Sequence, residues 1–339
     1  MQCSDTPQTM VEVFFEDTTI SECLKAQNIR ALVDLETLYC SEQPLISLEG
    51  LQHFPNLVKI YVWQAPKVEL DFSTLPNLRT VSVKGDDFDS LDLSHNTELR
   101  ELLLRDPNGL SHLDLSGNTA LETLIVADSN LANLMLPETD TLKLIRINGA
   151  PLSTLDLTGN RGLEVINLMS NQLTTLALPD SPVLRELAVG NNALTEITVP
   201  VSPKLEAADF RQNPLMALSL EAPVLTSLYI SKTEITEFDA RSLPSLTLME
   251  AKHLPLRSID LSNAEDLIAL YVSGAHLSQL DLSENRALKY ITMHGNLITT
   301  IDVSNNREIV TFEYSKEILS EFRIITSDDH PRKWENVEW

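Results

Sequence analysis

Aromatic and basic residues are scarce in this sequence, and long apolar runs are absent. Phe, Trp and Tyr make up 5% of the 339 residues while hydrophobic residues make up 43%, so the apolar content is mostly Leu, Ile and Val. No run approaches the roughly 18 apolar residues of a membrane-spanning helix, so we expect no transmembrane segment. With 25 basic and 49 acidic residues the formal net charge is −24. This charge disfavours nucleic acids and anionic membranes as partners.

Cysteines are also few, and the three present, Cys3, Cys23 and Cys40, do not make a disulfide framework. Cys3 is followed by Ser4 and Asp5, which resembles the start of a mature bacterial lipoprotein and makes Cys3 a candidate for lipidation. The alternative is an ordinary cysteine in a frayed terminus. Cys23 and Cys40 could form a disulfide in an exported protein, but we expect two buried free thiols.

A repeat of about 21 residues dominates what the sequence does contain. The phrase Leu91-Asp92-Leu93-Ser94 recurs with that period, and a second phrase, L-x-x-L-x-L-x-x-N-x-L, runs half a period away and is clearest over 163–173 and 184–194. Each phrase alternates apolar and polar residues, as a strand with one buried face does. The sequence therefore predicts about fourteen stacked coils, each with two short parallel strands.

The second phrase resembles the leucine-rich-repeat consensus, and the 21-residue L-D-L-S-x-N form resembles the repeats of internalin-J-like bacterial proteins. The resemblance implies a right-handed, β-rich leucine-rich-repeat solenoid with two parallel sheets and with 3-10 or α elements only near the N-terminus. In that family a cysteine can take the third apolar position of the strand. Only Cys40 does so here, and no cysteine ladder is expected. The family's asparagine position is held by Asn171, Asn192, Asn213 and Asn296.

Both ends of such a stack need caps, because exposed terminal leucines would aggregate. We expect residues 1–34 to form an N-terminal cap, with a strand over 11–15 and a helix over 19–28. The solenoid is predicted to span 35–324. Residues 325–339, which include Trp334 and Trp339, are expected to form a C-terminal cap or tail.

The outward residues of the L-x-x-L-x-L strands are predicted to line a concave, ligand-binding face. Tyr39, Tyr61 and Trp63 form an aromatic group near the N-terminal coils, with Lys84 and Arg105 beside it. Aromatic and arginine side chains exposed together are common interface anchors; the alternative is that β-propensity alone favours Tyr, Ile and Val here. The other candidates on this face are Leu103, Ile125, Arg146, Arg211, Tyr229, Tyr271 and Tyr290.

The other phrase carries a column of outward aspartates that could in principle recruit calcium. We favour a solvated, aggregation-resistant face instead, since the column is interrupted and lacks glycine-rich calcium turns. The seven histidines are scattered, and no phosphate loop, dinucleotide turn or nucleophile elbow is present. We therefore expect no catalysis, no cofactor and no metal. The aspartates are Asp92, Asp114, Asp156, Asp239, Asp260, Asp281 and Asp302.

These patterns predict a monomeric, non-catalytic recognition scaffold that binds a protein or glycan across the concave face. We expect it outside the cell, on the bacterial outer surface or in the periplasm, with a lipid anchor if Cys3 is lipidated. Two alternatives stay open. One is a structural or adhesive spacer whose faces contact nothing specific, and the other is an effector that binds a single protein target.

Overall fold

The computed structural model describes residues 18–40, 48–63, 70–85, 88–314, 322–327 and 330–331. The chain divides into two compact units, Met1–Leu163 and Glu164–Trp339, and each unit is a stack of short coils. Cys3, the strand expected over 11–15 and both C-terminal tryptophans lie outside the described residues. No helix within them is long and apolar enough to cross a membrane.

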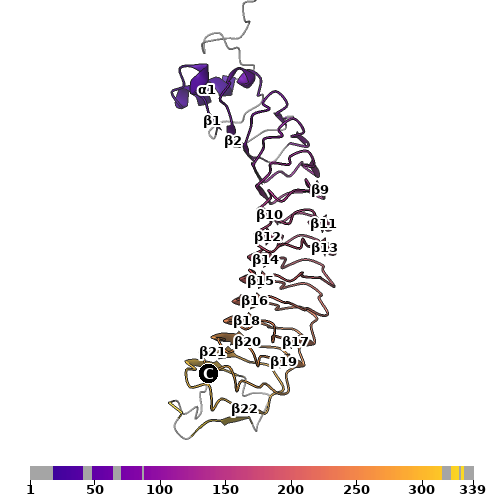
Figure 1. The fold of residues 1–339 in the computed structure, drawn as a ribbon, viewed down its shortest axis with the longest axis vertical. Coiled ribbons are helices and arrows are strands. Elements are labelled where there is room, and N and C mark those ends of the chain that lie inside the picture. The colour runs from indigo at the N-terminus through magenta and orange to yellow at the C-terminus, as the bar shows by residue number, and fades with distance from the viewer. Residues whose placement is uncertain are drawn as a thin grey trace, which may run out of the picture. The chain divides into compact units, whose positions relative to one another are not determined.

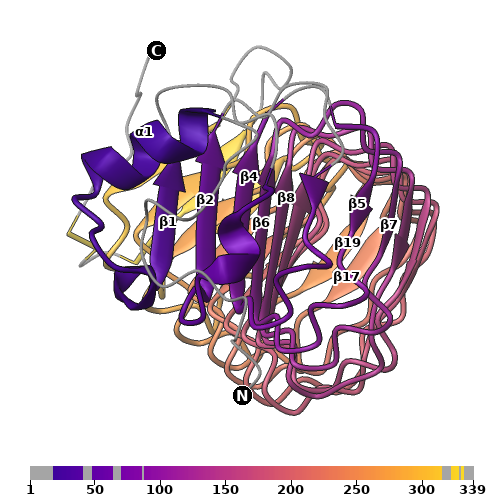
Figure 2. The same ribbon diagram turned by 90° about the horizontal axis from the view of Figure 1, so that it is seen from above.

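The first unit is built on one parallel sheet, preceded by a short helix (Figures 1 and 2). The helix expected over 19–28 is present as α1 (Thr18–Ala26), and two 3-10 turns follow, η2 (Leu32–Asp34) and η3 (Leu51–His53). Each coil adds one strand in register with the previous one, so that Tyr39 pairs with Tyr61. The strand order is β1 (Thr37–Cys40), β2 (Lys59–Trp63), β4 (Thr80–Lys84), β6 (Glu101–Arg105), β8 (Thr123–Ala127) and β10 (Leu144–Asn148).

The second unit repeats the arrangement with shorter strands. Successive strands again pair in parallel at the same register, as Asp209 with Tyr229 shows. Six sheet strands in the first unit and eight in the second agree with the predicted number of coils. The order here is β12 (Val165–Asn167), β14 (Glu186–Ala188), β15 (Ala207–Asp209), β16 (Ser227–Tyr229), β18 (Leu248–Glu250), β20 (Ala269–Tyr271), β21 (Tyr290–Thr292) and β23 (Thr311–Glu313).

The second sheet is less regular than predicted, because its strands pair only locally. Residues 193–200, 214–220 and 279–282 form no strand at all. In the first two stretches Thr198 and Ser219 stand where other coils have aspartate, and Pro200 has no N–H to donate to a side chain at the strand end. The third stretch keeps its aspartate, Asp281. The strands are β3 (Leu70–Asp71), β5 (Leu91–Asp92), β7 (His112–Asp114), β9 (Asn133–Met135), β11 (Thr154–Asp156), β13 (Thr175–Ala177), β17 (Glu237–Asp239), β19 (Ser258–Asp260), β22 (Thr300–Asp302) and β24 (Arg323–Ile325).

Inward residues of the sheet strands make the dry core that the alternation predicts. In β6, Leu102 and Leu104 are fully buried while Leu103 between them is half-buried and points outward. Burying one such side chain contributes about 1.5–3 kcal/mol to the free energy of folding. Each coil buries several such side chains. The stability of a coil therefore depends on its neighbours.

In many coils, one residue shortly after the sheet strand has a left-handed backbone conformation. Its φ lies between 53° and 70°, a conformation that Gly, Asn and Asp adopt at least cost. The amide of this residue donates to a carbonyl of the next coil, for example from Asp106 to Ala127 at 3.0 Å and from Asn191 to Arg211 at 2.7 Å. The column comprises Asp106, Asp128, Gly149, Ser170, Asn191, Gln212, Lys232, His253, Gly274 and Gly295.

Two asparagine ladders satisfy backbone groups in the turns. At the predicted position, Asn213 donates to the carbonyl of Val189 and accepts from the amide of Leu194. A second ladder, whose role the sequence did not reveal, uses the final asparagine of L-D-L-S-x-N. Its Nδ2 donates to two carbonyls of the preceding coil, as Asn118 does to Leu93 and Asn96. The members of the second ladder are Asn96, Asn118, Asn160, Asn285 and Asn306.

A disulfide joins the helix to the sheet. Cys23 of α1 is bonded to Cys40 of β1, with their Cα atoms 5.4 Å apart. The expectation of two free thiols was wrong, because the sequence does not show how closely α1 packs against β1. The bond fixes the helix beside the first strand, and the helix covers the N-terminal end of the core.

Candidate binding surface

Exposed aromatic side chains gather at the N-terminal strands of the first unit. Tyr39 and Tyr61 occupy the same register on β1 and β2, and their rings stack with centroids 4.9 Å apart and planes inclined by 13°. Tyr39 is 55% exposed and Trp63, two residues beyond Tyr61, is 51% exposed. Partial burial, together with the nearby Tyr39 hydroxyl and Glu101 carboxylate, raises the pKa of Tyr61. The phenol therefore stays neutral at physiological pH and can donate a hydrogen bond.

The predicted cations lie on the same face. Trp63, Lys84 and Arg105 align across three successive strands. Lys84 Nζ lies 3.9 Å from Asp106 Oδ2, whereas the side chains of Arg105 and Arg146 contact no carboxylate among the described residues. Leu103 and Ile125 pair between Tyr61 and Arg146 and form a half-buried apolar strip. We call the set Tyr39, Tyr61, Trp63, Lys84, Leu103, Arg105, Ile125 and Arg146 the N-terminal patch.

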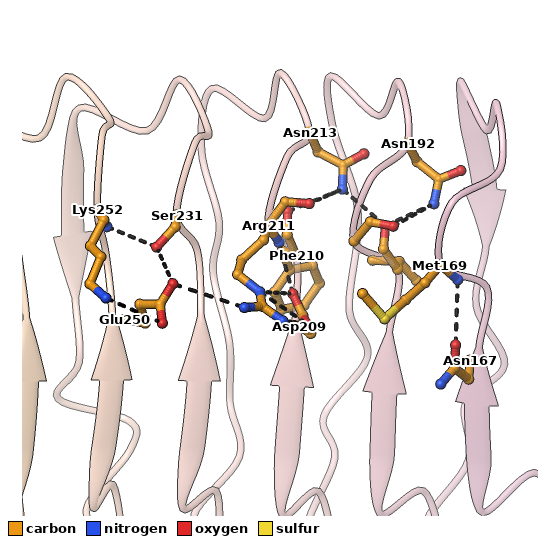
Figure 3. Close-up of polar contacts among 12 residues, drawn as sticks. Asn167, Met169, Asn192, Asp209, Phe210, Arg211, Asn213, Ser231, Glu250 and Lys252 are labelled. Atoms are coloured by element: carbon orange, nitrogen blue, oxygen red, sulfur yellow. Dashed lines mark hydrogen bonds and ion pairs between the residues drawn. The ribbon is translucent and has the colours of Figure 1, made fainter. Parts of the chain in front are cut away.

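Arg211 organises a different kind of surface in the second unit (Figure 3). Its Nε and Nη2 donate to the two oxygens of Asp209 at 3.0 and 2.6 Å, and the guanidinium lies over the ring of Tyr229 at 4.8 Å. Asp209 is the largest cause of the raised pKa of Arg211. The guanidinium is thus neutralised by a partner from its own strand region.

Glu250 extends this network toward the next coils (Figure 3). It lies 3.9 Å from Arg211 Nη1 and 3.7 Å from Lys252 Nζ, and it accepts a hydrogen bond from Ser231 Oγ at 2.9 Å. Lys252 in turn lies over the ring of Tyr271 at 4.8 Å. The predicted residues Arg211, Tyr229 and Tyr271 are therefore brought together. The charge of Arg211 is paired with Asp209, and a cation of the same chain lies over each tyrosine ring.

Tyr290 is not brought into this network. It lies at the first residue of β21, 40% exposed, and pairs with Ala269 and Thr311. Sequence reasoning missed Asp209, Glu250 and Ser231 as partners. The alternation of an acid and a base two residues apart, at Asp209 with Arg211 and at Glu250 with Lys252, was the signal that could have found the pairs.

The outward aspartates of the other phrase act on the backbone. Asp92 Oδ1 accepts the amide hydrogen of Ser94 at 2.9 Å, and the other six form the same turn with the residue two positions on. Arg241 adds a side-chain bond that lowers the pKa of Asp239 to about 2. The described residues hold no group of three or more His, Cys, Asp or Glu side chains arranged to bind a metal ion. Six of the seven aspartates are the last residues of second-sheet strands, and Asp281 makes the same turn without a strand.

The fold is shared with solved structures. No protein-family model matches the sequence, and no curated protein sequence is similar to it. The functional domain of InlJ from Listeria monocytogenes superposes with a TM-score of 0.67 at 23% identity, over 88% of this chain and 74% of that one. This chain has an internalin-like leucine-rich-repeat fold.

Two further leucine-rich-repeat structures agree. The internalin InlF from Listeria monocytogenes superposes with a TM-score of 0.63 at 20% identity, over 93% of this chain and all (100%) of that one. The effector YopM from Yersinia pestis gives 0.63 at 21% identity, over 91% and 92%. The InlJ domain is described as including a cysteine ladder, whereas here Cys40 alone among the sheet strands holds that position and is bonded to the helix. These three structures share the fold of this chain.

Proposed function

We propose that this leucine-rich-repeat chain is a recognition scaffold that binds a protein through the N-terminal patch, on the face predicted to be concave. The observation that carries the proposal is the outward aromatic group in which Tyr39 and Trp63 are exposed and Tyr61, stacked on Tyr39, is half-buried. Large aromatic side chains in water bury much area at low entropic cost when a partner covers them. The second unit supports the same conclusion by contrast, because Arg211, Tyr229 and Tyr271 there contact other side chains of the chain. The proposal assigns the chain no catalytic step and no cofactor.

We place the chain outside the reducing cytosol, on a cell surface or in a periplasm. The disulfide between Cys23 and Cys40 supports this location, because such bonds persist in oxidising compartments. Lipidation of Cys3 stays a prediction, and mass spectrometry of the native N-terminus tests it. A diacylglyceryl or acylated Cys3 would favour surface tethering over the effector alternative.

A random peptide library selected on the immobilised full chain tests the proposal. The double variant Tyr61→Ala with Trp63→Ala should lose most selected clones, since the area that anchors them is gone. It should lose little thermal stability, because Trp63 is exposed and Tyr61 is half-buried on the outward face of its strand. Met216→Ala, which removes a 69% exposed side chain outside the sheet, is the matched control and should retain the clones. Full retention by the double variant would contradict the proposal and favour a spacer. Binding of the chain to a glycan array, without selection of any peptide clone, would replace the protein ligand with a sugar.

A further inference from the structure

We propose that the N-terminal patch takes an extended acidic peptide segment that lies across the strands, with an aromatic or apolar side chain followed by carboxylates about three residues apart. This inference rests on the proposed function and specifies the chemistry of its ligand.

Two cations of this patch, Arg105 and Arg146, have no carboxylate partner among the described residues, whereas Lys84 lies 3.9 Å from Asp106. In a chain of net charge −24, nearby acids are plentiful. Arg100, beside the same sheet, binds Glu122 at 2.8 Å, and Arg211 binds Asp209 at 2.6 Å. Arg105 and Arg146 make no such pair among the described residues, although both lie on sheet strands. A guanidinium left free presents a planar fork that matches a carboxylate.

The strand register sets the distances between these groups. Trp63 and Arg105 share one register position two strands apart, so their Cα atoms lie about 10 Å apart at ~4.8 Å per strand. A polyproline-type segment advances ~3.1 Å per residue with three residues per turn. Side chains three positions apart in such a segment therefore face the sheet about 9 Å apart, close to the spacing of Trp63 and Arg105.

Arg146 continues the same track. It lies two strands beyond Arg105 and two residues nearer the start of its strand, which places its Cα about 12 Å from that of Arg105. A second carboxylate three or four residues after the first can reach it, because arginine side chains are long. Leu103 and Ile125 line the path between Tyr61 and Arg146 and suit apolar groups of the intervening residues.

The aromatic geometry favours a peptide over a sugar. Sugars stack on open ring faces, but Tyr39 and Tyr61 stack on each other at 4.9 Å, so each ring already covers one face of its neighbour. Ring edges and hydroxyls then remain for contact, which suits side chains and backbone amides. An anionic oligosaccharide is the competing ligand class, and the experiment includes it.

Fluorescence anisotropy with synthetic peptides tests the inference on the full chain. One probe carries Trp with Glu three and six residues later, a second has Gln in place of both Glu, and a third has the two Glu at spacings of two. We expect the first probe to bind at least about tenfold more tightly than the other two, with an affinity that falls as salt is added. Equal affinity for the Gln probe, or for the third probe, would overturn the proposal.

A charge swap supplies the control. The variant R105E with R146E should lose the Glu probe and gain the corresponding Lys probe, while R79E with R100E, the same charge change beside the sheet face, should leave both affinities unchanged within about twofold. Binding of a sulfated oligosaccharide that depends on Arg105 and Arg146, without binding of the Glu probe, would refute the peptide class. If library clones need Tyr61 and Trp63 but are not acidic, this inference fails while the proposed function stands.

Discussion

Arg211 lies 4.8 Å over the ring of Tyr229, held there by two hydrogen bonds to Asp209 that leave the carboxylate only 12% exposed. The two ions and the ring come from adjacent strands, β15 and β16, and the turn after β15. In the first unit Arg105 occupies the equivalent outward column and has no such partner in the part of the chain that the structure describes. The arginine at this repeat position thus stabilises the second unit, whereas in the first unit it can bind a carboxylate of a partner.

Arg211→Ala should destabilise the second unit, because it leaves the largely buried carboxylate of Asp209 without its main partner. We expect a loss of about 1–3 kcal/mol in the free energy of unfolding, measured by urea denaturation. Arg241→Ala breaks a similar pair with Asp239, but both side chains are more than half exposed, at 62% and 52%. That control should cost less than Arg211→Ala, because water screens an exposed ion pair. Equal losses would show that burial of Asp209 does not matter.

Leu102 and Leu103 are neighbours in β6 with opposite orientations. Leu102→Ala empties a fully buried site and should cost about 2–5 kcal/mol in unfolding free energy. Leu103→Ala should cost well under half as much, since that side chain is only half-buried on the outward face. Paired urea curves check the difference. Similar costs would mean that the strand faces are assigned wrongly.

Gly274→Ala should destabilise the chain by about 1 kcal/mol or more, because its φ is +68° and an added Cβ would lie 2.6 Å from His253 Nδ1. Gly117→Ala is the matched control, since nothing lies within 4 Å of the added atom. Thermal unfolding of the two variants should separate them by several degrees, with the control near wild type. A neutral Gly274→Ala would argue against the left-handed turn.

The aspartate turns should make the free energy of unfolding fall as the pH is lowered in the acidic range. Hydrogen bonds lower the folded pKa of Asp239 from 3.8 to about 2, so its stabilisation is present above pH 3.8 and is lost as the pH falls through about 2. Asp239→Asn should flatten the stability curve in this window. The effect should shrink at high salt because the carboxylate is exposed. Urea midpoints between pH 5 and pH 2 provide the measurement, and an unchanged pH profile would count against the turn.

The disulfide predicts a thiol count and a stability loss. Denatured, unreduced protein should react at one thiol, Cys3, and reduced protein at three. The double variant Cys23→Ser with Cys40→Ser should lose about 3 kcal/mol, since the bond closes a loop of 17 residues. Three reactive thiols in protein from an oxidising expression host would contradict the bond.

Much of the fold was readable from single residues at fixed intervals. The alternation at 163–173 predicted β12 with its buried Ile166, and the buried Leu168 directly after it, because a period-two pattern with one apolar face has one stable arrangement in a stack. The left-handed column was also within reach, since Gly, Asn or Asp fills six of its ten positions. Its regularity was missed because Ser170, Gln212, Lys232 and His253 carry no such signal.

The surface was less predictable. The outward aromatic and basic residues were located by register alone, and that placement holds for Tyr39, Tyr61 and Trp63. The partners were not predictable, because a pairing such as Arg211 with Glu250 joins side chains about two coils apart whose rotamers depend on packing. Binding at these residues stays a proposal.

The sequence alone determined the repeat, the strand faces and the leucine core, because each follows from local periodicity and the free energy of removing apolar side chains from water. Only the tertiary structure decided that Cys23 meets Cys40, that Glu250 approaches Arg211 and that Arg105 has no carboxylate partner among the described residues. Those outcomes depend on distances between residues that the chain brings together by stacking, and no local pattern encodes such distances.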